Sequence, residues 1–163
     1  MIRSHRIRLN PTPEQAVYFA KAAGTRRFVF NWGLAEWQRQ YDAGEKPSAL
    51  ALKKQFNAVR KEQFPWSYDV TKCVIEGAFM DLASAFKHFF EGIKGGRKVG
   101  FPKFKQKKHS REGFYLANDK FDVSGHLGHS VASLPRKCAH GAAKSWRWDS
   151  SIHRVKHVRV AGQ

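Results

Sequence analysis

The chain has 163 residues, of which 42% are hydrophobic and 13% aromatic, enough for one buried core, and this excludes wholesale disorder. Its 30 Lys and Arg against 13 Asp and Glu give a net charge of +17, which is typical of a protein that faces a polyanion. An anionic membrane surface is the competing partner, but no run of about 18 apolar residues predicts a membrane span. We therefore expect a nucleic-acid partner, no membrane partner and a cytoplasmic, nucleoid-associated location.

The first predicted elements are a strand and a pair of helices. Apolar and polar residues alternate over 2–9, which is the pattern of a half-buried strand. A capping box at 12–15 begins a helix, and Gly24 fits its end. Thr25 can then cap a second helix that runs to about residue 41. Two helices joined by a tight glycine turn form a helix-turn-helix arrangement.

Two further helices are predicted next. Ser48 can cap a helix over 48–63, whose inward face is Leu52, Phe56 and Val59. One continuous apolar stripe then predicts a helix over about 71–94. Its members are Ile75, Phe79, Leu82, Phe86, Phe89 and Ile93. After the Gly95-Gly96 stop, a short strand pattern covers about 114–123, so the fold class is mainly α with flanking β and a partial β region at the end.

A basic segment lies between the last helix and that strand pattern. Residues 94–111 hold eight Lys or Arg and no acid, with Phe101 and Phe104 interleaved. Cations contact phosphates, and an exposed ring can stack on a base. The alternative is a solvated charge run with both rings buried in the core. Arg26 and Arg27, at the start of the second predicted helix, form another candidate patch because helix N-termini also bind phosphate.

The composition changes near Gly125. All 13 phenylalanines come earlier, and Asp149 is the one acid that follows. We divide the chain into 1–94, 95–125 and 126–163. The last part is a basic tail that is predicted to be disordered, because it has few large apolar residues to offset its chain entropy. It is either a natural basic arm or an out-of-frame ending, and its Trp and Val residues between 146 and 160 allow one short strand.

No arrangement of residues predicts a catalytic or metal site. Hydrolysis with two metals needs several converging carboxylates, whereas Glu76, Asp81 and Glu91 stand singly at the spacing of a solvated helix surface. Cys73 and Cys138 make no paired zinc motif. Neither a Gly-x-Ser-x-Gly elbow nor a Walker-type loop is present. We expect no enzyme activity, no cofactor and no metal.

Five short segments, in order, resemble the TnpB (OrfB) proteins of bacterial insertion sequences. They are RLNPTPEQ at 8–15, GTRRFVFN at 24–31, DVTK at 69–72, AFKHFF at 85–90 and VGFPKFK at 99–105. The last is similar to the family's G-(Y/F)-P-(K/R)-F-K segment. Each segment alone is weak, but their order over about 120 residues is specific.

The resemblance implies an RNA-guided DNA endonuclease family related to type V Cas nucleases. Its first strand belongs to a wedge-like β-barrel, and its helices form a recognition lobe that contacts the guide–target heteroduplex and a short adjacent DNA motif. By position Lys72 matches a residue that contacts this motif, Glu76 stands where some relatives carry Gln, and Asn118 falls near another such position. With the cations of the charge pattern, the candidate nucleic-acid contacts are Arg26, Arg27, Lys72, Arg97, Lys98, Lys103, Lys105, Lys107, Lys108 and Asn118.

The resemblance stops at about residues 123–125, where the composition changes. The family continues into a completed barrel, a RuvC-like nuclease and a Cys-x-x-Cys ribbon, so we expect a truncated or frameshifted copy. The leading interpretation is a fragment that binds DNA, a guide RNA or both, without its own nuclease. A stand-alone helix-turn-helix regulator and the binding subunit of a split RNA-guided endonuclease are the alternatives.

Overall fold

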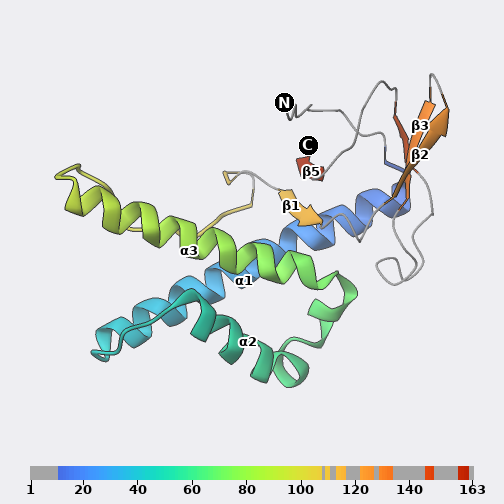
Figure 1. The fold of residues 1–163 in the computed structure, drawn as a ribbon. Helices are drawn as coiled ribbons and strands as arrows, with labels where there is room; N and C mark the ends of the chain where they lie inside the picture. The colour runs from blue at the N-terminus through green and yellow to red at the C-terminus, as the bar shows by residue number, and fades with distance from the viewer. Residues whose placement is uncertain are drawn as a thin grey trace.

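The computed structural model describes residues 11–107, 109–110, 113–116, 122–126, 129–133, 146–148 and 158–161. Three α-helices dominate it: α1 (Pro13–Asp42), α2 (Ala49–Gln63) and α3 (Lys72–Lys94), with a short 3-10 helix, η1 (Pro65–Asp69), between the last two. Figure 1 shows α1 and α3 as two long crossing rods, with α2 packed beside them. The predicted mainly α class is confirmed, while the strand expected over 2–9 lies outside the described residues.

The start of α1 follows the predicted capping box. The backbone N–H of Gln15 donates to the hydroxyl of Thr12 at 3.3 Å, and the Gln15 side chain accepts from the backbone N–H of Thr12 at 2.8 Å. Pro13 occupies the first turn, where a missing N–H costs nothing. These are contacts between residues three apart, so local sequence is sufficient to predict them.

The predicted break between two helices at Gly24 and Thr25 is wrong, because α1 runs through both residues. The Thr25 hydroxyl does not cap a helix; it donates to the carbonyl of Lys21, one turn back, at 2.8 Å. Thr25 is buried, and Ala22 and Val29 on the same stripe are buried as well. Packing of this stripe offsets the roughly 1 kcal/mol that a glycine costs inside a helix. The four predicted helices are therefore three.

The turn after α1 and the start of α2 agree with the prediction. Gly44 has a φ of 82°, which favours glycine, and the hydroxyl of Ser48 accepts from the N–H of Ala51 at 3.2 Å. Val59 is only partly buried, and the buried residue one turn beyond Phe56 is Arg60.

The Arg60 guanidinium is held inside the fold by neighbours from η1. It donates to the hydroxyl and the carbonyl oxygen of Ser67, each at 2.7 Å, and lies 4.0 Å from the ring centroid of Tyr68. Burial lowers the pKa of Arg60 from its ordinary value, and the nearby Tyr68 opposes that shift. The paired hydrogen bonds explain why a charged residue can take a core position on α2.

The main core lies where α1 crosses α3. Gly33 makes the crossing close, since a Cβ there would lie 2.8 Å from Leu82 Cδ2 and 3.3 Å from Phe79 Cε1. The predicted stripe of α3 is buried from Ile75 to Phe86 and partly buried at Phe89. Its last predicted member, Ile93, is exposed, because Gly92 is the residue of that turn that meets the returning chain at Val99.

A second, smaller core joins the first half of α1 to the strand β1 (Gly113–Leu116). Phe114 packs edge-on against Tyr18, with ring centroids 6.2 Å apart, and Leu116 lies in the same cluster. The single strand pattern predicted over 114–123 is two strands, β1 and β2 (Asp122–His126).

The remaining strands are antiparallel. β2 pairs with β3 (His129–Ser133), β3 pairs with β4 (Trp146–Trp148), and β1 pairs with β5 (Val158–Ala161). Strands therefore occur on both sides of position 125, and more than the one short strand expected beyond it. The rest of the predicted disordered tail lies outside the described residues.

Candidate nucleic-acid interface

Residues 97–107 lie within the basic stretch at 94–111 and fold back along α3; from this point they alone are called the basic segment. Gly95 ends the helix, and Gly96 has a φ of 66°. The backbone N–H of Arg97 then donates to the carbonyl of Gly92 at 3.0 Å. Further on, the ring of Phe101 packs edge-on against Phe86 and Phe89, with centroids 5.5 and 5.4 Å apart. The segment is therefore laid on the helix surface by apolar contacts.

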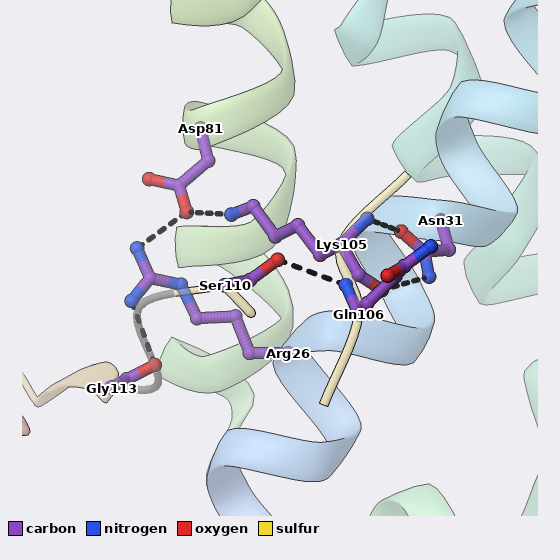
Figure 2. Close-up of polar contacts among 7 residues, drawn as sticks. All are labelled: Arg26, Asn31, Asp81, Lys105, Gln106, Ser110 and Gly113. Carbon is purple, nitrogen blue, oxygen red and sulfur yellow. Dashed lines mark hydrogen bonds and ion pairs between the residues drawn. The ribbon is translucent and has the colours of Figure 1, made fainter. Parts of the chain in front are cut away.

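Asn31 of α1 holds the far end of the segment by its backbone. Its side-chain amide donates to the carbonyl of Lys105 at 2.9 Å, and its side-chain oxygen accepts from the N–H of Lys105 at 2.8 Å (Figure 2). The next residue is tied as well, because the N–H of Gln106 donates to the hydroxyl of Ser110 at 2.9 Å. The two hydrogen bonds between the Asn31 side chain and the backbone of Lys105, called the Asn31 clamp below, fix both the position and the orientation of the chain at Lys105.

Asp81 of α3 binds two of the predicted nucleic-acid contacts. One carboxylate oxygen accepts from Lys105 Nζ at 3.0 Å and from Arg26 Nη2 at 2.5 Å, as Figure 2 shows. Arg26 also donates to the carbonyl of Gly113 at 2.8 Å, and Lys105 Nζ lies 4.0 Å from the ring centroid of Phe30. The side chains of Arg26, Lys105 and Asp81 are only 16%, 28% and 31% exposed.

The geometry therefore gives Arg26 and Lys105 a structural role in joining α1, α3 and β1. Each is engaged by partners inside the fold, and each is mostly covered. Asp81 in turn is more than the solvated surface carboxylate that its spacing suggested, because it pairs with two cations and is only partly exposed.

The other cations of this region face solvent. None of them forms an ion pair with another residue in the part of the chain that the structure describes. Lys87 of α3 differs, because its Nζ lies 3.8 Å from a carboxylate oxygen of Glu91. The solvent-facing cations are Lys94, Arg97, Lys98, Lys103 and Lys107. All five are exposed cations within a short stretch of chain, and cations of this kind commonly contact phosphates.

The remaining predicted contacts lie elsewhere. Arg27 is partly exposed in the interior of α1, so the expected reinforcement by a helix N-terminus does not apply to it. Lys72 is the exposed first residue of α3, and Glu76 one turn later is paired with Lys53 of α2 at 3.1 Å. Lys108 and Asn118 lie outside the described residues.

The two phenylalanines of the segment differ in their surroundings. Phe101 and Phe104 are 43% and 52% exposed, so the alternative in which both rings are buried is wrong. Phe101 rests on two other rings, whereas Phe104 makes no ring contact within the described residues.

Asn31 was not predicted to hold the basic segment, and Asp81 was predicted to be a solvated surface residue. Asn31 is 74 residues from Lys105, and Asp81 is 55 residues from Arg26. No local pattern marks either one, since both contacts arise only when the helices cross.

Acidic residues in the described part of the chain are dispersed. No group of three or more His, Cys, Asp and Glu residues comes close enough there to hold a metal ion. Within the same residues, no helix is both long and apolar enough to cross a bilayer.

Known proteins resemble part of this chain. Residues 1–46 match the model of the OrfB/IS605 helix-turn-helix domain. The chain is 28% identical over 127 residues to "Putative RNA-guided DNA endonuclease Rv2885c" of Mycobacterium tuberculosis, which covers 65% of this chain and 27% of that protein. It is 27% identical over 126 residues to "Putative RNA-guided DNA endonuclease InsQ" of Escherichia coli, with 74% and 29% covered. The chain thus spans under a third of the length of these relatives.

Proposed function

Starting from the confirmed likeness of this chain to the OrfB (TnpB) proteins of insertion sequences, we propose that it is a nucleic-acid-binding part of such a protein. DNA is the first partner, because the family model that matches residues 1–46 describes a helix-turn-helix domain, although Pro13–Asp42 form one long helix here. The basic segment supplies the contacts to phosphates, and Lys72 is a further contact at the start of α3.

One observation carries this proposal. The exposed cations of the basic segment are unpaired among the described residues, while the Asn31 clamp, Asp81 and Phe101 hold their backbone in place. A flexible run of lysines would lose chain entropy on binding, whereas a fixed row has already lost it on folding. The arrangement favours a phosphate-binding surface over a merely solvated loop. This surface, called the phosphate ridge below, consists of the exposed cations Lys94, Arg97, Lys98, Lys103 and Lys107.

A guide RNA is the second proposed partner. Contacts to phosphates do not distinguish DNA from RNA, so the same ridge is suited to either strand of a heteroduplex. The likeness to relatives named as RNA-guided endonucleases supports this partner.

We further propose that this chain alone binds without cutting. The carboxylate of Asp81 forms ion pairs with two cations, and those of Asp69, Glu76 and Glu91 each pair with one lysine. Incubation with supercoiled plasmid and Mg²⁺ or Mn²⁺ tests this: intact plasmid is expected, and linear or nicked product would overturn it.

The salt dependence of binding tests the main proposal. Affinity for a short labelled duplex is expected to fall steeply between about 50 and 200 mM NaCl, by roughly 10³-fold for six phosphate contacts. Changing Lys103→Gln and Lys107→Gln together should lower the slope of log K against log salt by about 1.8, since each phosphate contact contributes about 0.9.

The matched control removes the same charge elsewhere. Lys46 and Lys54 are exposed and lie outside the basic segment, so Lys46→Gln with Lys54→Gln should leave the slope nearly unchanged. Equal slopes for the two double variants would contradict the assignment of the ridge. A flat salt response of the unaltered chain would contradict phosphate binding altogether.

A further inference from the structure

Resting on the proposed nucleic-acid binding, we propose that Phe104 is a stacking platform for an unpaired base, held in place by the Asn31 clamp on the next residue. The ligand is a single-stranded segment of DNA or RNA. Its phosphates lie along the exposed cations of the basic segment, and one base lies on the ring.

The exposure of Phe104 is the first argument. Phe104 is 52% exposed, although removing a large apolar side chain from water is favourable. Phe101, three residues earlier, is the contrasting case, because it packs against Phe86 and Phe89 and so contributes to the fold. No ring of the described chain packs on Phe104, which leaves its ring open to a planar ligand.

The second argument is that the ring has a fixed base. Lys105 is bound through its backbone by Asn31, and its side chain donates to Asp81 (Figure 2). Its Nζ also lies over the ring of Phe30. Phe104, the residue before Lys105, is 52% exposed, whereas the Lys105 side chain is 28% exposed. A ring on an anchored backbone loses less entropy when it binds than a ring on a mobile loop.

The third argument is the charge around the ring. Lys103 precedes Phe104 directly and Lys107 follows three residues later, both exposed. Cations that follow a backbone beside an exposed aromatic ring are the combination that binds single strands, with stacking that tolerates any base. A base inside a duplex has both faces covered by its neighbours, so the ring distinguishes unpaired from paired strands.

The test compares Phe104→Leu with the unaltered chain on a labelled oligo-dT strand and on a duplex. Leucine keeps an apolar side chain but removes the π-face. We expect single-strand affinity to fall by roughly 5- to 150-fold, with duplex affinity and both salt slopes unchanged. Phe104→Trp should retain single-strand binding.

A matched control is Phe90→Leu, because Phe90 is 46% exposed but lies on α3 and contacts Phe86 and Phe89. It should leave single-strand affinity unchanged. As a second readout, the fluorescence of a strand carrying 2-aminopurine should be quenched when the unaltered chain binds, and quenched less by Phe104→Leu.

The outcomes separate this inference from the proposed function. If the unaltered chain binds with a steep salt slope but Phe104→Leu binds the single strand equally well, the platform is overturned and the phosphate ridge stands. Equal losses on the single strand and the duplex would also overturn it. If the unaltered chain binds neither probe, the proposed function itself fails.

Discussion

The Asn31 side-chain amide bonds to both the N–H and the carbonyl of Lys105, the two backbone groups that a neighbouring strand would pair with in a sheet. Asn31→Ala removes both bonds and changes no charge. The amide N–H of Lys105 should then exchange with solvent roughly 5- to 30-fold faster, if the two hydrogen bonds contribute about 1 kcal/mol each. Hydrogen exchange of the full chain, read by mass spectrometry or NMR, measures this directly.

Asn57→Ala is the control for that experiment, since Asn57 lies exposed on α2. It should leave the exchange of Lys105 unchanged. Equal protection of Lys105 in Asn31→Ala would show that the clamp does not hold the segment in solution.

Charge alone could not distinguish Arg26 and Lys105 from the other cations. Both were predicted to contact phosphates because they stand in basic runs. The structure places both on Asp81, a residue that is 55 positions from one and 24 from the other. Their roles depend on the crossing of α1 and α3, which no spacing within either run encodes.

At the scale of elements, the glycines Gly24 and Gly33 of α1 differ in the space available for a Cβ atom, so alanine should have opposite effects on stability at the two positions. Gly33 lies at the crossing with α3, where a Cβ would come within 2.8 Å of Leu82, so Gly33→Ala should lower the free energy of unfolding by about 1–3 kcal/mol. Gly24 has only the end of the Arg27 side chain within 4.0 Å of such a Cβ. Gly24→Ala should therefore raise the free energy of unfolding by about 0.5–1 kcal/mol. Denaturant unfolding of both variants measures the two signs.

The Gly24 variant also tests the continuity of α1. A helix that ended there would need glycine, and alanine would then destabilise the chain. A lower free energy of unfolding in Gly24→Ala would therefore support the predicted break at Gly24 and contradict a continuous α1.

Features that depend on contacts close in sequence were predictable, and those that depend on tertiary packing were not. The starts of α1 and α2 were predicted correctly, because Thr12 and Ser48 bond to residues three positions away. The break at Gly24 was predicted wrongly, because packing of Ala22 and Val29 keeps the helix intact. The burial of Arg60 was missed for the same reason, since its partner Ser67 is reached only when η1 turns back.

For the whole molecule, the dominant property is the net charge of +17. Charge of one sign attracts a polyanion and also repels itself, which destabilises the compact state. Salt screens both effects over a Debye length of about 10 Å at 0.1 M. Stability and nucleic-acid affinity should therefore respond to salt in opposite directions.

We expect the melting midpoint to rise by roughly 2–8 °C between low and moderate NaCl, as relief of about 1 kcal/mol of repulsion would give. The variant with Lys103→Gln and Lys107→Gln carries two fewer charges, so its midpoint at low salt should be higher and its rise smaller. Scanning calorimetry on both proteins measures the two midpoints. If the midpoint falls as salt rises, local ion pairs such as Asp81 with Arg26 and Lys105 outweigh the overall repulsion, because screening weakens attraction as well.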